Sequence, residues 1–229
     1  MKKIFFIISL LFCGMIIYGQ SDEKSEVRQL ESFDRLRISK GVNVTLIEGE
    51  KPEAEVVIVN AELDDVIIQQ KGKEVSIRMK TKIYKDVAVH VYVTYQNLKE
   101  IHAGSGGTLD SDDIIEADQL SLTAGLDAAI TLEIKVKKLK VSASAAFVQV
   151  SGTAENIDVR TSTGGKFIGE GLATTKATVK TNTGGTALVW VSELLDASAG
   201  SGARVEYFGN PKKVKIKESL GGRIIELDD

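Results

Sequence analysis

The segments Thr163-Gly164-Gly165-Lys166-Phe167 and Thr183-Gly184-Gly185-Thr186-Ala187 share one pattern: a hydroxyl residue, two small residues, any residue, then an apolar residue. Four further copies begin at Ser105, Ser144, Ser201 and Leu220, and only the last of them lacks the hydroxyl residue. Successive copies lie 39, 19, 20, 18 and 19 residues apart. The first step equals two periods, and a degenerate copy whose register the sequence does not fix stands near Ala124-Gly125-Leu126.

A fixed period of about 19 residues is typical of a solenoid, in which each turn buries its apolar face only against its neighbours. Outside the small-residue steps, apolar residues recur at every second position, as at Val87, Val89, Val91 and Val93. This alternation indicates half-buried strands. The sequence therefore predicts an all-β, single-stranded solenoid with coils of about 19 residues. A β-sandwich with glycine-rich hairpins is the alternative, but sandwiches rarely repeat the same step at a nearly constant spacing.

The two small residues of each copy predict a tight corner. The predicted corner glycines are Gly106, Gly107, Gly164, Gly165, Gly184, Gly185, Gly202, Gly221 and Gly222. Glycine permits a positive φ at a corner, and a larger side chain is expected to strike its copies in the coils on either side. On this view Gly184→Val costs more stability than a surface Lys→Ala substitution. The fifth residue of each copy is predicted to point inward and to form an apolar ladder.

The N-terminal residues 1–19 predict a secretory signal peptide, because a short basic start precedes an apolar run that ends at the small residue Gly19. The run is shorter than the roughly 20 residues that a spanning helix needs. We therefore expect an exported protein, in the periplasm, on the cell surface or outside the cell, with no transmembrane segment in the mature chain. Lipidation at Cys13 is the alternative, which the bulky Phe12 disfavours.

The remaining chain divides by regularity. Residues 20–30 are polar and predict a flexible lead-in, residues 31–99 predict an N-terminal β region that caps the solenoid, and residues 100–229 predict the repeat solenoid, continuous with 31–99. The net charge of −3 gives no reason to expect nucleic-acid binding.

The sequence contains no complete catalytic, cofactor-binding or metal-binding motif, so we expect none of these sites. The glycine-rich steps lack the further glycines and the Ser or Thr of nucleotide-binding loops. Asp110, Asp112 and Asp113 form the densest acidic cluster, a weak calcium candidate that a solvated loop explains equally. Sugar cleavage would need a second carboxylate nearby, such as Asp158 or Glu155 from a neighbouring coil.

One candidate binding surface follows from the period. The residues three positions before the copies are His102, Val141, Arg160, Lys180, Ser198 and Lys217. His102, Arg160, Lys180 and Lys217 would form a basic strip that could bind an anionic polymer, such as an acidic polysaccharide. Two lysine clusters, at 135–140 and 212–217, add to the positive charge. The alternative is that lysines on exposed strands discourage aggregation through strand edges.

The chain resembles the bacterial head-GIN domain family, described as putative auto-transporter adhesins and common in secreted proteins of Bacteroidetes-type bacteria. The resemblance rests on the signal peptide, the segment Ile38-Ser39-Lys40-Gly41-Val42-Asn43-Val44 after Phe33, and the repeated steps. It covers about residues 33–227. The family implies a right-handed parallel β-helix-like fold, a cell-envelope location and no established enzyme activity.

The expected function is therefore a non-enzymatic binding or adhesion module of the cell envelope, with an unknown ligand. A scaffold that recognises an envelope protein is one alternative, and a polysaccharide-active enzyme is another. The sequence does not predict the oligomeric state.

Overall fold

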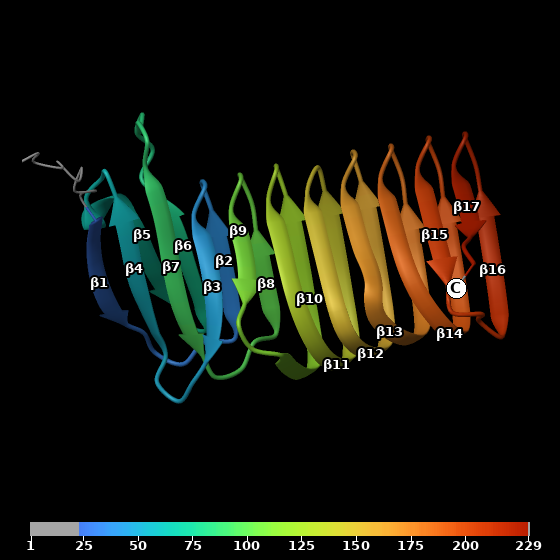
Figure 1. Ribbon diagram of the computed structural model, residues 1–229, viewed down its shortest axis with the longest axis horizontal. Helices are drawn as coiled ribbons and strands as arrows, with labels where there is room; N and C mark the ends of the chain where they lie inside the picture. The colour runs from blue at the N-terminus through green and yellow to red at the C-terminus, as the bar shows by residue number, and fades with distance from the viewer. Residues whose placement is uncertain (1–22, 229) are drawn as a thin grey trace, which may run out of the picture.

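The computed structural model describes residues 23–228, which form one 17-stranded sheet wound into an elongated stack of coils (Figure 1). About 68% of the residues lie in strands, and the stack is a β-solenoid of about 7 turns with coils of about 19 residues. The predicted solenoid is confirmed. The predicted signal peptide and Cys13 lie outside the described residues. Within residues 23–228, no helix has the length and apolar character to cross a membrane.

The elements, in chain order, are β1 (Glu23–Gln29), β2 (Arg35–Ser39), β3 (Asn43–Glu48), β4 (Glu53–Val59), the 3-10 helix η1 (Leu63–Asp65), β5 (Val66–Lys71), β6 (Glu74–Met79), β7 (Ala88–Tyr95), β8 (Glu100–Ala103), β9 (Thr108–Ser111), β10 (Ile115–Gly125), β11 (Ala129–Ser144), β12 (Phe147–Ser162), β13 (Lys166–Thr181), β14 (Thr186–Ala199), β15 (Arg204–Phe208), β16 (Lys213–Glu218) and β17 (Arg223–Glu226).

The regular coils follow one path from β10 onward. After each tight corner, at the top of Figure 1, the chain runs down one face, bends, and returns up the opposite face to the next corner. We call the half that follows a corner the descending face and the half that precedes a corner the ascending face. The long strands stack in parallel; for example, Val148 pairs with Phe167 on the descending face, and Val159 pairs with Val179 on the ascending face.

Apart from the shorter corner at Ala145, the corners of the regular stack are turns with two residues in the left-handed region. At the corner between β13 and β14, Thr183 has φ of 48° and Gly184 has φ of 69°, and the Gly185 N–H donates to the Asn182 carbonyl over 2.9 Å. Positive φ at both central residues is characteristic of type I′ turns. The corners are also joined to one another, because the Gly184 N–H donates to the Ser201 carbonyl of the next coil over 3.1 Å. The predicted alignment of the corners is confirmed.

The physical reason for the first glycine of each pair differs from the prediction. A Cβ atom added to Gly184 would meet no atom within 4 Å, and the same holds for Gly106, Gly164, Gly202 and Gly221. These glycines are needed for their positive φ and not for lack of space. The crowding occurs at the second glycine.

A Cβ atom on Gly185 would lie 2.8 Å from the Thr161 carbonyl carbon of the preceding coil. On Gly165 it would lie 2.3 Å from the Ala143 carbonyl oxygen. The second small residue is therefore the one that lets neighbouring coils approach each other.

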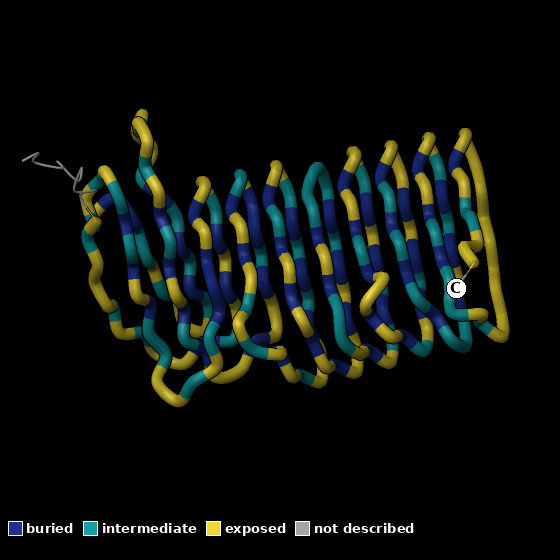
Figure 2. The backbone as a smooth tube through the Cα atoms, viewed as in Figure 1, coloured by how far each residue is buried: buried dark blue, intermediate teal, exposed yellow. Residues whose placement is uncertain are grey.

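The predicted inward ladder of fifth-position residues is confirmed. Its members, in stacking order, are Leu109, Ile130, Val148, Phe167, Ala187, Val205 and Ile224. All are buried except Ile224, which lies in the last coil and is partly buried. Ile130 fixes the register of the degenerate copy, whose corner is formed by Leu126 and Asp127. Figure 2 shows the buried residues alternating with exposed ones along each coil.

The N-terminal strands do not stack in chain order. The coil formed by β2 and β3 lies between the coil of β6 and β7 on one side and the coil of β8 and β9 on the other. Strand β5 pairs antiparallel with β6, β4 pairs antiparallel with β7, and β1 pairs antiparallel with β4. The end of the stack therefore consists of antiparallel strands.

The predicted flexible lead-in is wrong for residues 23–29, which form strand β1. The segment is polar because its core-facing side chains are charged. Arg28 pairs in register with the buried Ala54, and its guanidinium donates to the Val66 carbonyl over 2.7 Å and to the Leu63 carbonyl over 2.9 Å. These contacts order a segment that hydropathy alone does not identify as a strand.

Candidate binding face

The register brings the predicted basic residues into one column on the ascending face. The column runs Arg37, His102, Thr123, Ser142, Arg160, Lys180, Ser198 and Lys217. Arg160 and Lys180 are direct neighbours, whereas Ser198 separates Lys180 from Lys217. Ser142 takes the place predicted for Val141, because the corner before Phe147 is one residue shorter than the others.

His102 lies three coils away from Arg160, and it differs from the other basic residues in charge. Its pKa is lowered below the ordinary value for histidine, first because the ring is partly buried and second because the Arg37 guanidinium is near. His102 is therefore neutral at pH 7. The positive charge of the strip comes from Arg37, Arg160, Lys180 and Lys217.

The four cations are not equally available to a ligand. The Arg160 guanidinium lies 3.3 Å from the Asp158 carboxylate, and the Arg37 guanidinium lies 3.9 Å from the Glu74 carboxylate. Within residues 23–228, Lys180 and Lys217 form no ion pair within 4.0 Å. An exposed ion pair contributes little stability and can exchange partners.

A groove of about 870 Å³ lies next to the strip on the same face. Beneath it lie Leu98, Leu120, Leu139 and Ile157, whose side chains are buried. Its polar lining includes Asn97, Gln119, Ser121, Lys138, Lys140, Asn156, Asp158 and Thr178. Residues two apart on a strand point to the same side, so Lys140 adjoins Ser142 and Asp158 adjoins Arg160. The groove and the strip therefore form one continuous surface.

The lysines of the 135–140 cluster divide between two sites. Lys135 lies 3.0 Å from the Glu116 carboxylate, and Lys137 lies 2.7 Å from the Asp118 carboxylate. The Lys137 bond lowers the pKa of the Asp118 carboxyl group. These pairs line a second hollow of about 540 Å³ at the bend. Lys138 and Lys140 face the groove and, among residues 23–228, have no ion-pair partner within 4.0 Å.

The acidic cluster at 110–113 has a structural role. The Thr45 hydroxyl donates to the Asp110 carboxylate over 2.6 Å, and the Glu48 N–H donates to the Asp113 carboxylate over 2.8 Å. In the described part of the chain, no group of three or more His, Cys, Asp or Glu side chains could hold a metal ion. The calcium candidate of Asp110, Asp112 and Asp113 therefore has no support.

The structure also separates the carboxylates considered for sugar cleavage. Asp110 follows a corner and lies on the descending face in β9, whereas Asp158 precedes a corner and lies on the ascending face in β12. The buried ladders lie between the two faces. Asp110 and Asp158 cannot act on one glycosidic bond.

The groove itself was not predicted. Its amides and hydroxyls, such as Gln119, Asn156 and Thr178, occur singly and form no motif. Only the two groove lysines had a signal, as members of a lysine cluster. The register from β10 to β13 brings these residues together. A local repeat does not reveal which outward columns of residues line a groove.

The fold is shared with several solved structures. A putative adhesin from Bacteroides fragilis superposes with a TM-score of 0.82 at 15% identity, over 90% of this chain and 97% of that chain. A putative adhesin from Parabacteroides merdae has a TM-score of 0.74 at 18% identity, over 92% and 98%. A putative lipid binding protein from Parabacteroides distasonis has a TM-score of 0.68 at 15% identity, over 92% and 98%.

No curated protein matches the chain. Residues 32–211, however, match the family described as "Putative auto-transporter adhesin, head GIN domain". The match covers both the irregular N-terminal coils and most of the regular stack, and it includes Arg160 and Lys180 of the strip and the lining of the groove. The chain belongs to the head GIN domain family of putative auto-transporter adhesins.

Proposed function

We propose that the protein is an exported, non-enzymatic adhesion module that binds an anionic polymer, such as an acidic polysaccharide, along its ascending face. The observation that carries the proposal is the continuity between the groove and the basic strip. Lys138 and Lys140 face the groove without ion-pair partners in the described chain, and Lys180 and Lys217 continue the positive charge along the stack.

The composition of the groove favours a carbohydrate. Saccharides present both hydroxyls and apolar C–H faces, and specific sites combine an apolar surface with a few placed polar groups. The groove offers the amides of Gln119 and Asn156 together with the apolar stems of Lys138 and Lys140. The lysines would supply selectivity for a carboxylated or sulfated chain over a neutral one.

The geometry of the stack favours an extended polymer over a small ligand. Parallel coils repeat about every 4.8 Å, so equivalent side chains recur at regular intervals along the long axis. A chain that lies along this axis would meet the same type of contact in successive coils. Several weak contacts of this kind add up to useful affinity through multivalency.

The test compares binding of polygalacturonate and of neutral dextran to the protein and to charge variants. We expect polygalacturonate to bind and dextran not to bind. The variant Arg160→Glu/Lys180→Glu/Lys217→Glu should weaken polygalacturonate binding by at least about ten-fold, because charge-assisted contacts are lost. Its thermal midpoint should stay nearly unchanged, because all three side chains are exposed.

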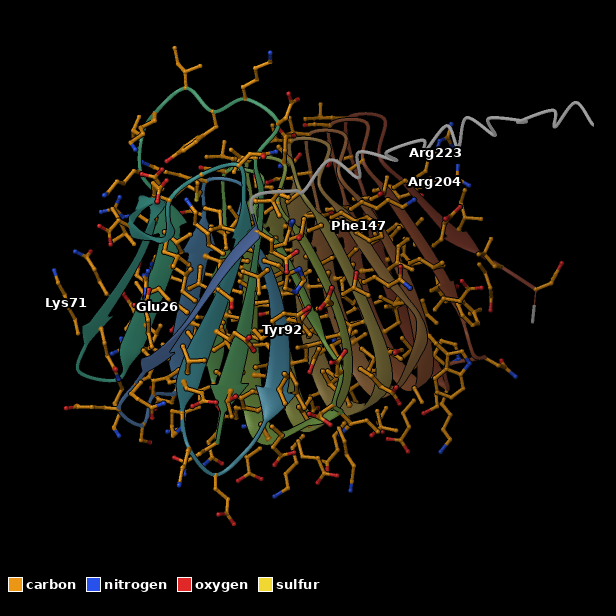
Figure 3. All side chains as sticks on the ribbon, turned by 60° about the vertical axis from the view of Figure 1, so that its left-hand side comes forward. Glu26, Lys71, Tyr92, Phe147, Arg204 and Arg223 are labelled. Carbon is orange, nitrogen blue, oxygen red and sulfur yellow. The ribbon has the colours of Figure 1, made fainter. Side chains whose placement is uncertain are left out.

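A matched control exists on the opposite face. Lys166, Arg204 and Arg223 form a comparable exposed column on the descending face, and Arg204 and Arg223 lie close together in Figure 3. Reversing these three charges should leave binding intact. Equal losses in both variants would indicate attraction to net charge without a site, and intact binding in the first variant would exclude the strip. Shortening of the polymer on incubation would favour an enzyme instead.

A further inference from the structure

The two ends of the stack are built differently. At the N-terminal end, the core-facing side chains of the last strand, β1, are Lys24, Glu26 and Arg28, which pair in register with buried residues of β4. Arg28 donates to two carbonyls across the end of the stack and to the Glu26 carboxylate over 2.8 Å. Inward-pointing charges of this kind prevent an edge strand from pairing with another chain.

At the C-terminal end, the core-facing side of β16 carries two apolar side chains and then one charge, Glu218, which pairs in register with the buried Ala199 and accepts from the Ile224 N–H over 2.6 Å. Val214 and Ile216 of β16 continue the buried ladders of Leu195 and Ala197. Leu195 and Ala197 are 0% and 1% exposed, whereas Val214 and Ile216 are 37% and 50% exposed. The whole of β16 is exposed, as the last ascending strand in Figure 2 shows. The ladders end at this strand with apolar side chains uncovered.

The outward side chains of β16 are all basic. Lys213, Lys215 and Lys217 alternate with the apolar pair along the strand. Lys215 lies 3.8 Å from the Asp196 carboxylate, and in the described chain Lys213 and Lys217 have no ion pair within 4.0 Å. The free edge therefore presents a row of positive charge beside a row of apolar side chains.

We propose that β16 is a docking edge for a strand of a different protein, one that alternates acidic and apolar residues. Such a strand would add to the sheet through main-chain hydrogen bonds, cover Val214 and Ile216 with its apolar residues, and place its carboxylates beside the lysines. The proposal shares Lys217 with the basic strip, but its apolar contacts lie at the end of the stack and do not depend on polymer binding.

A second copy of this chain fits the edge poorly. Two β16 strands paired antiparallel about Lys215 would place Lys213 opposite Lys217, and like charges directly opposite each other are destabilising. In another copy, the edge strand β1 presents the charged side chains of Glu26 and Arg28 toward the core. The edge strand β5 presents Ile67, Gln69 and Lys71 outward and so offers no carboxylate to the lysines of β16. A distinct acidic partner avoids these conflicts.

The test uses three fluorescent eight-residue peptides and the full mature protein. One peptide alternates Glu with Val, the second has the same composition with the four Glu before the four Val, and the third alternates Lys with Val. Fluorescence anisotropy should show the alternating acidic peptide binding at least about ten-fold more tightly than the other two. Hydrogen exchange should show that this peptide protects the amides of residues 213–218.

Two variants locate the interaction. Ile216→Lys should weaken binding at least about ten-fold, because it places a charge on the core-facing side of the edge. Val27→Lys is the matched control, since Val27 is 51% exposed on the edge strand at the other end, and it should leave binding unchanged. The hydrogen-exchange result on the unmodified protein stands even if Ile216→Lys does not fold.

Three results would overturn the proposal. Equal affinity for all three peptides, or no binding of any of them, would mean that β16 does not select an alternating acidic strand. Protection outside residues 213–218 would place the interaction elsewhere. Dimerisation in sedimentation velocity that Ile216→Lys abolishes would make a second copy the occupant.

Discussion

Phe167 in β13 lies directly opposite Ala187 in β14, so the largest side chain of the inward ladder stacks on the smallest. Both are buried, at 0% and 3% exposure. A Cβ atom on Gly169 would lie 2.7 Å from the Phe167 ring, so the ring also occupies the space that a side chain at position 169 would need. The ladder therefore matches volumes between coils instead of repeating one residue.

This relationship predicts a coupled pair. Phe167→Ala should destabilise the protein by about 3–5 kcal/mol because it leaves a cavity, and Ala187→Phe should cost about 1–3 kcal/mol because it overpacks the adjacent coil. The double variant should cost less than the sum of the two, with a coupling energy of about 1–3 kcal/mol. Guanidinium denaturation of the four proteins measures the cycle.

Recovery in the double variant should be incomplete. Position 189, two residues after 187, is a buried valine, whereas position 169 is glycine. A ring at position 187 therefore lacks the space that Gly169 gives Phe167. Strict additivity of the two costs would show that the residues do not share one packing site.

The corner glycines give a second prediction. Gly184→Val should cost about 1–2 kcal/mol, because a residue with a side chain must adopt φ near 69° there. Gly185→Val should cost at least about 3 kcal/mol, because its Cβ atom would lie 2.8 Å from the Thr161 backbone, and the coils would have to separate. Urea denaturation should rank the two variants in this order.

Gly185→Ala is the informative intermediate. Ala203 occupies the equivalent corner position in the next coil and is 1% exposed. The stack can therefore accommodate one methyl group, and we expect a cost below that of Gly185→Val. If Gly184→Val proved the more damaging substitution, crowding at the first glycine would be the correct explanation after all.

The regular half of the fold was predictable because the residues that determine each coil lie close together in the sequence. Each coil repeats its own corner and inward residues, so Thr163-Gly164-Gly165 and Thr183-Gly184-Gly185 could be aligned without coordinates. The same alignment predicted that Arg160 and Lys180 are neighbours. It failed at Val141, because one corner is a residue shorter and shifts Ser142 into the column.

The N-terminal half was not predictable in the same way. The coil of β2 and β3 stacks against strands that lie about 40 and 65 positions later in the chain, as in the pairs Leu36–Val75 and Leu36–Ile101. No local pattern specifies such pairings. Strand β1 was not predicted for another reason. It is ordered by hydrogen bonds of Arg28, and a hydropathy pattern assigns a charged residue such as arginine to the solvent-exposed surface.

Tyr95 gives a prediction for alkaline pH. Burial raises its pKa to about 12, and the carboxylates of Glu48 and Asp113 add to the effect. The hydroxyl has no hydrogen-bond partner within 3.5 Å in the described chain, and the nearby Ser111 hydroxyl donates to the Asp113 carbonyl over 2.8 Å. The unfolded chain loses this proton near pH 10, whereas the folded chain keeps it to about pH 12.

The contribution of protonated Tyr95 to stability is therefore fully present below pH 10. As the pH rises from 10 to 12, the free energy of unfolding falls, by about 3 kcal/mol at the upper limit. Tyr95→Phe should reduce this loss, and at pH 8 it should leave stability unchanged or raise it by about 1 kcal/mol, since no hydrogen bond is removed. Tyr207→Phe is the control, because the Tyr207 hydroxyl lies 3.2 Å from the Glu226 carboxylate and the alkaline loss due to Tyr95 should persist in that variant. Urea denaturation at pH 8, 10 and 11 measures all three proteins. A Tyr95→Phe variant that is clearly less stable at pH 8 would show that the hydroxyl has a partner in solution.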